Sequence, residues 1–450
     1  MIGKKIVLYA RSSRHNRFAC SQPMHIRKNV VASDAISLDK EMIVGDAVMR
    51  QMRGQSPVIS DPVLDEYLQD IGNRLVVHAD NAKFPFEFFW VNNDAINAFA
   101  FFGGHIGVHT GLMRRAENES ELASVLAHEI SHVTQRHIAR RMQAQQRSSP
   151  LALASLIGGV LIAMANPEAG IAAMQAGTAA SAQLQIDYTR SNEQEADRIG
   201  IAMLARAGFD PNAAASFFST MAEEYRMVSR PPARLLTHPL TETRIADARS
   251  RAGDYPRRYL PINKQFELAK ARIKARYSFK TDYAVEYFQA AVAQDVQRSK
   301  EASLYGLALA YMRAEKIEKA KEIMDQLIAG DRGNLFYLDA MTDISLNQAN
   351  AYISAQKYEE AISLLKDFLL VKKDYQLAHQ LMTEAYQKSK RFSQMHQSKA
   401  EVYALYGAYN RAVDELQYAY NFAGDDHLEK QRIRARIKQF RDQEERLQRL

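Results

Sequence analysis

Aromatic or large apolar residues recur in the C-terminal half of the chain as pairs six residues apart, and the pairs themselves recur. They are Tyr277/Tyr283, Tyr311/Ile317, Tyr352/Tyr358, Tyr386/Phe392 and Tyr403/Tyr409. Two of the steps between pairs are 34 residues, one is 41 because of an insertion around 330–334, and the last, 17, is half a repeat. A period of this length predicts stacked supersecondary units, each packed on its neighbours.

Small residues keep fixed places beside these pairs, three residues before the first member or three after the second. They are Ala308, Ala320, Ala349, Ala361 and Ala412. The pattern resembles tetratricopeptide repeats, in which small residues let two antiparallel helices pack closely. We therefore expect residues 262–450 to form an α-solenoid whose concave surface binds other polypeptides. A plain helical bundle is the alternative.

Composition limits the chemistry of the chain. Its 450 residues suggest about three domains, and 47% hydrophobic with 25% charged residues is the mix of a soluble globular protein. A single cysteine, Cys20, excludes a disulfide framework and a cysteine-built zinc site, so a metal must be held by His, Asp or Glu. A net charge of +7 over this length does not predict a nucleic-acid partner.

Helical patterns dominate the N-terminal half. Apolar spacing predicts helices between 37 and 79, over 119–142, and over 184–227 with a stop at Gly208–Pro211. A short helix follows, and Asp254–Pro261, with two prolines, is the expected linker. We therefore expect one domain over 37–254 and a second over 262–450.

Two strands are expected between the first helices and the helix that begins near 119. Phe84–Val91 is rich in aromatic residues, and Phe99–Val108 resembles a second strand. Gly103 and Gly104 lie in its middle, which indicates either a β-bulge or an edge opened for an extended peptide. In the second interpretation, Asn97, Phe99, Gly103 and Gly104 hold the substrate.

Two segments bear on membranes and export. Residues 1–36 begin with a basic stretch, but the apolar run Ile6–Ala10 is too short for an export signal, so a leader or degenerate export segment is expected. Leu151–Ala165 contains fifteen apolar or small residues, fewer than the roughly 20 that span a bilayer. We expect no transmembrane span; the run forms a buried hairpin or, alternatively, a peripheral contact with a bilayer or an apolar client.

The motif that carries chemistry is His128-Glu129-Ile130-Ser131-His132. One helical turn separates His128 from His132, so both imidazoles lie on one face and can bind one zinc ion. Glu129 lies beside them, where it can take a proton from metal-bound water. An apolar stripe places this helix in a core; its members are Leu122, Val125, Leu126, Ile130 and Val133.

A second helix supplies carboxylates. Glu193 and Asp197 are four residues apart and share one face, whereas Glu195 points away from them. We assign Glu193 as the third ligand and Asp197 as the acceptor of the far N–H of a ligating histidine. Gly200 should let this helix approach its neighbour closely.

With these motifs, the segments Asn97–Gly104, Asn192–Gly200 and Thr237–Leu240 resemble the gluzincins of the CAAX-prenyl-protease and HtpX type. The resemblance implies a mainly α chain, in which a gluzincin metalloprotease domain of helices with a small β-sheet precedes the repeats. It also implies one Zn²⁺ per chain held by His128, His132 and Glu193, with Glu129 as general base.

The repeats that follow the motifs resemble the branch of this family that acts on bacterial outer-membrane proteins. That resemblance implies a periplasmic endopeptidase that degrades misfolded or misassembled β-barrel proteins and assists their assembly. Its expected partners are extended polypeptide clients and the β-barrel assembly machinery, bound through the repeats. The alternative is a chaperone or adaptor whose zinc site is structural or latent.

His238 precedes a proline, so its backbone is biased to be extended and its side chain can reach into a cleft. One hypothesis places His238 in the fourth zinc position, where it holds the enzyme idle. The other gives it a substrate hydrogen bond or a packing role. His137, five residues beyond His132, is expected to be structural because it lies off the zinc-facing side.

Overall fold

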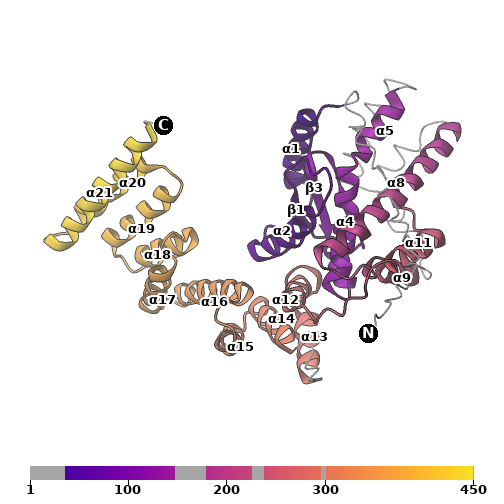
Figure 1. Ribbon diagram of the computed structural model, residues 1–450. Helices are drawn as coiled ribbons and strands as arrows, with labels where there is room; N and C mark the ends of the chain where they lie inside the picture. Colours follow the sequence, from indigo (N-terminus) through magenta and orange to yellow (C-terminus); the bar gives the residue numbers. More distant parts are fainter. Residues whose placement is uncertain (1–35, 147–178, 226–237, 295–299, 449–450) are drawn as a thin grey trace, which may run out of the picture.

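The computed structural model describes residues 36–146, 179–225, 238–294 and 300–448. These residues form a mainly helical molecule with one small sheet, and a curved array of helices follows the sheet-containing domain (Figure 1). The predicted fold class is thereby confirmed. No helix in the described ranges is long and apolar enough to cross a membrane. The predictions for the leader, apart from Ile36, and for 151–165 lie outside these ranges.

Two capped helices open the N-terminal domain. The side chain of Ser37 accepts a hydrogen bond at the start of α1 (Leu38–Gln55), and that of Asp61 does so at the start of α2 (Pro62–Val76). α2 packs its apolar face on the sheet, and the indole of Trp90 donates to the carbonyl oxygen of Leu64 at 2.9 Å. The first turn of α2 is therefore fixed to the central part of the core.

The sheet has three strands in the order β1-β3-β2. β1 (Glu87–Val91) runs parallel to β3 (His105–His109), and β2 (Ala98–Ala100) runs antiparallel to β3 with Phe99 opposite Gly107. The prediction of a strand over 84–91 is confirmed. That of a single strand over 99–108 is wrong, because the chain reverses at a turn of 3-10 helix, Phe102–Gly104.

The glycine pair makes this reversal. Gly103 and Gly104 have φ of 80° and 88°, the left-handed region that glycine adopts without strain. Both are buried, and a Cβ on Gly104 would lie 2.6 Å from the carbonyl oxygen of Pro85. The glycines therefore form a tight hairpin turn rather than a bulge in one strand.

The helix expected over 119–142 is two helices. α3 (Thr110–Arg115) leads to α4 (Glu119–Thr134), and α5 (His137–Gln146) follows after a break. Arg136 lies in the break with a left-handed φ of 53°, and its guanidinium donates to buried Glu41 of α1 at 2.9 Å. The single-helix prediction is therefore wrong at this point.

α8 (Ala179–Ala207), α9 (Ala213–Tyr225) and α11 (Glu242–Ala252) complete the domain. α8 packs along α4, and a Cβ on Gly200 would lie 3.2 Å from the backbone nitrogen of His128. The predicted close approach at Gly200 is confirmed. The stop at Gly208 is also present, with φ of 88°.

The C-terminal region is a succession of helices in which neighbours along the chain pack together. They are α12 (Lys264–Ile273) with a π-helical turn (Lys274–Ser278), α13 (Thr281–Ala293), α14 (Lys300–Arg313), α15 (Ile317–Gly330), α16 (Leu335–Ser354), α17 (Tyr358–Val371), α18 (Gln376–Lys388), α19 (Phe392–Leu405), α20 (Tyr409–Phe422) and α21 (His427–Gln448). The alanines at the predicted offsets are fully buried between helices. The array is therefore consistent with a solenoid of repeats.

One recurring turn explains the six-residue spacing. The carbonyl oxygens of Tyr311, Tyr352, Tyr386 and Tyr403 each accept the backbone N–H five residues later, at 2.8 to 3.0 Å. The residue next before that donor is left-handed in each case: Glu315, Gln356, Lys390 and Gly407. The second member of each of these four pairs then begins the next helix. The six-residue spacing within these pairs therefore records the length of this turn.

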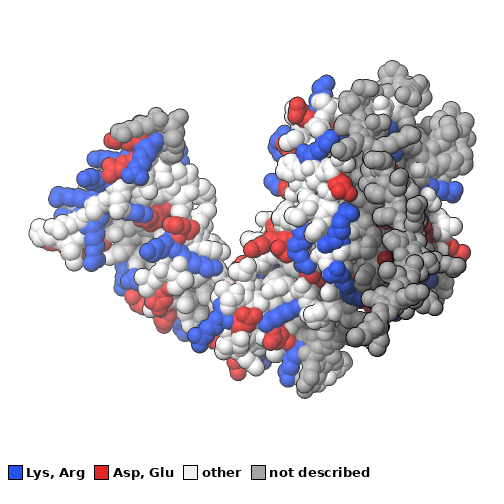
Figure 2. Space-filling view, viewed as in Figure 1, with Lys and Arg blue, Asp and Glu red and all other residues white. Residues whose placement is uncertain are grey.

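The core runs without a break from the N-terminal domain through the first repeats as far as Ile344 in α16. Beyond it, two separate clusters fill the distal repeats, one over 346–386 and one over 400–440. The helices from α18 to α21 stand apart from α1 and α2 (Figure 1). Basic and acidic side chains are interspersed over the visible face of both regions (Figure 2).

Candidate metal centre

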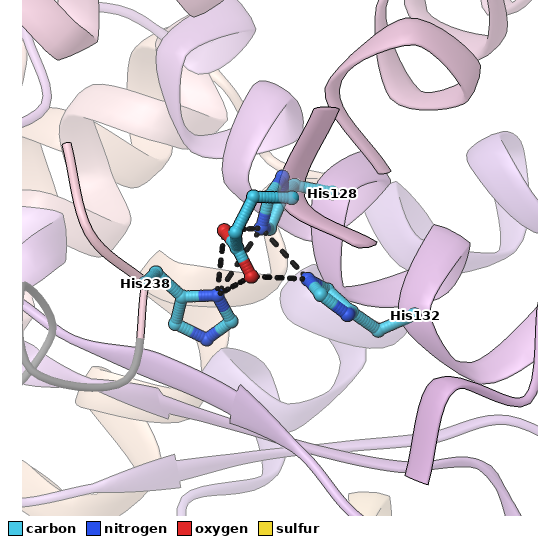
Figure 3. Close-up of side chains that lie close together, drawn as sticks. His128, His132 and His238 are labelled. Carbon is cyan, nitrogen blue, oxygen red and sulfur yellow. Dashed lines mark hydrogen bonds and ion pairs between the residues drawn. The ribbon is translucent and has the colours of Figure 1, made fainter. Parts of the chain in front are cut away.

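Two helices and one loop residue build the centre. α4 presents His128 and His132 one turn apart, and α8, packed against it, presents Glu193. His238 approaches from the stretch before α11. The three imidazoles point toward one another (Figure 3). One possible ligand atom from each of these four residues lies within 4.8 Å of the other three, so the structure brings together all four predicted ligands.

The spacing of these atoms fits a tetrahedral ion. His128 Nε2 lies 3.0 Å from His132 Nε2 and 3.3 Å from His238 Nδ1. The two oxygens of Glu193 divide between the imidazoles, with Oε2 3.3 Å from His128 Nε2 and Oε1 3.3 Å from His132 Nε2. A tetrahedral zinc with bonds of about 2.0–2.1 Å would separate its ligand atoms by about 3.3–3.4 Å. The observed separations of 3.0–3.3 Å are close to these values, so the donor set and its spacing suit a zinc ion.

The chemistry of the donor set points the same way. Carboxylate oxygens and lone-pair imidazole nitrogens all accept, so at such distances a cation or a proton must lie between them. Burial disfavours the charged form of His128, but Glu193 and Asp197 outweigh it and raise the pKa of its imidazole to about 9. Burial likewise raises the pKa of Glu193, but His238, His132 and His128 lower it well below its usual value. The site is built for positive charge.

Asp197 lies behind His128, on the side away from the ligand cluster. Its Oδ1 is 2.8 Å from His128 Nδ1, which leaves Nε2 to face the centre. Arg244 of α11, 5% exposed, donates its Nε–H to Asp197 Oδ2 at 2.7 Å and a second N–H to Oδ1 at 2.8 Å. Burial opposes ionisation of Asp197, but the His128 bond and Arg244 lower the pKa of its carboxyl.

Comparison with known proteins decides the family. Residues 62–252 match the model of peptidase family M48. The chain is 42% identical to a putative β-barrel assembly-enhancing protease of Vibrio cholerae and 41% identical to the β-barrel assembly-enhancing protease of Escherichia coli. Each match covers 92% of this chain and at least 91% of the relative. The chain belongs to peptidase family M48.

This M48 chain is therefore a metalloendopeptidase of the β-barrel assembly-enhancing type, and the predicted family is confirmed. A more distant relative is the mitochondrial metalloendopeptidase OMA1 of Schizosaccharomyces pombe, 26% identical over 179 residues, or 40% of this chain. The near relatives match the repeats as well as the peptidase domain, since they align over almost the whole chain.

In the M48 chain, Glu129 and His238 meet beside the ligands. Glu129 is 1% exposed, and its Oε1 lies 3.8 Å from His238 Nε2. His238 Nδ1 faces the other way, 3.0 Å from Glu193 Oε1. His238 thus stands between Glu129 and Glu193.

Arg244 is a residue of this M48 centre that the sequence analysis did not identify. Besides Asp197, it reaches Glu193 Oε2 at 3.0 Å and the carbonyl oxygen of Pro239 at 2.8 Å. It therefore joins the His238 loop to the carboxylates of α8. In the sequence, Arg244 is a single arginine seven residues after Thr237. Its spacing does not distinguish it from an arginine exposed on the surface.

The residues predicted to hold substrate separate in the M48 structure. Phe99 lies on β2, an edge strand that contacts α4, and is half-buried. Asn97 precedes β2 and is buried, and its carbonyl oxygen accepts the N–H of His109 at 3.0 Å. Gly103 and Gly104 are covered by α1 and by the segment at Pro85. Among the described residues, β2 is the edge strand that lies beside α4.

Proposed function

We propose that this M48 peptidase is a zinc-dependent endopeptidase that degrades misfolded or misassembled outer-membrane β-barrel proteins and assists their assembly. The observation that carries the enzymatic part is the cluster of four metal-ligating side chains beside buried Glu129. The client class is supported by identity to β-barrel assembly-enhancing proteases over 92% of the chain. We propose a periplasmic location as well, because the proposed clients are outer-membrane proteins.

His128, His132 and Glu193 would hold the zinc, one ion per chain, and His238 would supply a fourth ligand in the resting enzyme. A bound zinc ion polarises the scissile carbonyl and lowers the pKa of water to about 7. Asp197, held by Arg244, keeps the Nδ1 proton on His128 so that Nε2 stays a ligand.

Glu129 acts as the general base. Its carboxylate accepts a proton from the attacking water and later delivers it to the leaving amine. β2 would hold the substrate extended by backbone hydrogen bonds, because it is an edge strand of the sheet and packs beside α4, which carries Glu129. Backbone recognition suits unfolded segments of many sequences.

His238 would act as a gate. Its ring lies between Glu129 and the ligands, where the attacking water must stand. Departure of the loop that carries His238 would open this position and leave the other three ligands in place. The repeats would bind clients or the assembly machinery on their concave surface.

The test is cleavage of casein, with zinc content measured on each variant. Glu129→Gln should keep one zinc per chain and lose about 10²–10⁴-fold in rate. Glu121→Gln is the matched control, because Glu121 is a buried glutamate of the same helix that bonds Ser216 and the backbone of Glu117 instead of the metal ligands. Cleavage that survives in Glu129→Gln would overturn the assignment.

The gate is tested in the same assay. His238→Ala should retain zinc through the other three ligands and cleave faster than wild type. An unchanged or lower rate would contradict the gate and leave the base assignment standing.

A chaperone or adaptor with a structural zinc is the second candidate, and the presence of four protein ligands favours it. The two candidates differ in Glu129→Gln. A chaperone would assist the assembly of an outer-membrane protein equally well in this variant, whereas removal of misassembled protein would be lost only for a protease.

A further inference from the structure

We infer that His137 and Glu195 are positioning residues for the metal ligand His132: His137 accepts the Nδ1 proton of His132 and donates its own Nε2 proton to Glu195. This inference rests on the zinc site of the proposed function and extends it to a second support.

The break after α4 creates this contact. Had the helix continued through Arg136, His137 would lie five residues, about 140° around the axis, from His132. The left-handed turn at Arg136 instead returns the chain, and His137 packs edge-on against His132 with ring centroids 4.8 Å apart. His137 is 4% exposed. The side chain that helical spacing places elsewhere is therefore in direct contact with a ligand.

The distances define a chain of hydrogen bonds. His137 Nδ1 lies 2.8 Å from His132 Nδ1, and His137 Nε2 lies 3.2 Å from Glu195 Oε2. Arg140, one turn further along α5, donates to the same carboxylate oxygen at 2.7 Å. Both ring nitrogens of His137 are thus engaged, one by the ligand and one by a carboxylate.

The ligand role of His132 fixes where the protons lie. A metal-bound Nε2 has no proton, so neutral His132 carries its proton on Nδ1 and donates it to His137. His137 must then be unprotonated at Nδ1 and protonated at Nε2, which is the proton that Glu195 accepts. One arrangement of protons satisfies every group from His132 to Glu195.

The two histidine ligands therefore have different supports. His128 donates directly to a carboxylate, Asp197, which Arg244 holds. His132 reaches its carboxylate, Glu195, through an intervening imidazole, and Arg140 holds that carboxylate. This also explains why α8 carries three carboxylates in five residues: one for the metal, and one for each histidine.

The test compares zinc affinity, by competition with a chromophoric chelator, among folded variants. His137→Phe keeps the bulk of the ring and removes the acceptor, and zinc should bind about 10–100-fold more weakly. His137→Asn places an amide oxygen near the position of Nδ1, so the affinity should return to within a few-fold of wild type. Glu195→Ala should give a smaller loss than His137→Phe.

His396→Phe is the matched control. His396 lies in α19, bonds a carboxylate of Glu415 at 2.7 Å, and is remote from the centre. Its zinc affinity should equal that of wild type. The absorption spectrum of the Co²⁺-substituted protein gives a second readout, which should change in His137→Phe and return in His137→Asn.

The outcomes separate the inference from the function on which it rests. Wild-type protein that binds no zinc would overturn the proposed function and this inference together. Wild-type protein that binds zinc, with His137→Phe equal to it, would overturn the inference alone. If His137→Phe retains the zinc affinity and His137→Asn loses it, His137 has only a packing role and the inference is overturned.

Discussion

Two buried polar clusters in this chain differ in one respect, the balance of hydrogen-bond donors and acceptors. The metal centre presents a set of atoms that are all acceptors when the histidines bind metal, namely the Nε2 atoms of His128 and His132, His238 Nδ1 and the Glu193 carboxylate, although Arg244 also reaches that carboxylate. The second cluster lies where α2 meets the first repeat helices, and we call it the junction cluster. It consists of Asp61, Arg272, Tyr277, Tyr305 and Asp339.

Arg272 supplies the donors of the junction cluster. It is 1% exposed and donates to Asp61 Oδ2 at 2.7 Å, to the hydroxyl of Tyr305 at 2.8 Å and to Asp339 at 2.6 Å. Tyr277 also donates to Asp61, at 2.7 Å. Asp61 belongs to the peptidase domain and the others to the repeats, so these bonds join the two domains.

The comparison shows how burial alone fails to identify a functional site. Both clusters are polar and buried, but the junction cluster is satisfied by its own side chains, whereas the metal centre needs a cation from outside. The first is a structural joint and the second a binding site.

The largest expected change in stability comes from breaking the junction cluster. Arg272→Ala removes the cation that bonds buried Asp61 and leaves Arg276, 4.0 Å away, as the other one; breaking a buried pair in this way typically costs about 3–5 kcal/mol. Trp90, the only tryptophan, reports the loss by its fluorescence in urea, because its indole bonds the first turn of α2. Zinc content should not change. A loss of unfolding free energy below about 1 kcal/mol would mean that the two domains are held together by contacts other than the junction cluster.

Removal of metal should destabilise the other cluster and leave the junction intact. With free zinc at 100 times Kd, binding stabilises the native state by about 2.7 kcal/mol. A chelator should therefore lower the urea midpoint of wild type, and should do so by the same amount in Arg272→Ala. Equal urea midpoints with and without chelator would contradict the conclusion that the acceptors of the metal centre need a bound cation.

A smaller change is expected from the support of His128. Asp197→Asn removes the charge that Arg244 and His128 share, so zinc affinity should fall about 10–100-fold, or about 1.4–2.7 kcal/mol. Asp247→Asn is the control, because Asp247 pairs with Arg251 on the surface of α11. An unchanged affinity in Asp197→Asn would remove Asp197 from the centre.

The smallest change is expected from an exposed ion pair in the repeats. Arg391 lies 2.5 Å from Glu359, and both side chains are largely exposed to solvent. Arg391→Ala should alter the unfolding free energy by less than about 1 kcal/mol, as measured by circular dichroism in urea. A loss of unfolding free energy as large as that of Arg272→Ala would show that burial does not determine which ion pairs stabilise the protein most.

The sequence alone predicts the elements whose signal is local. His128 and His132, or Glu193 and Asp197, share a helix face by spacing, and the six-residue spacing within the aromatic pairs follows from a turn of fixed length. Three features cannot be predicted from the local sequence. Arg136 adopts a left-handed φ although it is not a glycine, and Gly103 forms a hairpin turn where the same sequence is compatible with a bulge. Arg244 contacts Asp197 of α8, which lies 47 residues earlier in the chain.

The error at His137 follows from the first of these. Helical spacing places it off the metal side only if the helix continues through Arg136. Because the helix ends there, His137 contacts His132. A break caused by a non-glycine residue depends on the tertiary partner, here Glu41 of α1, and such a contact has no signature in the local pattern.

The central claim is that the acceptor-only cluster holds one zinc ion on nitrogen and oxygen ligands. Zinc K-edge X-ray absorption on the purified wild-type chain tests it most directly. The account predicts one zinc per chain, with neighbours at about 2.0–2.1 Å and no heavier shell. A chain without zinc, or zinc with a sulfur shell at about 2.3 Å, would contradict it.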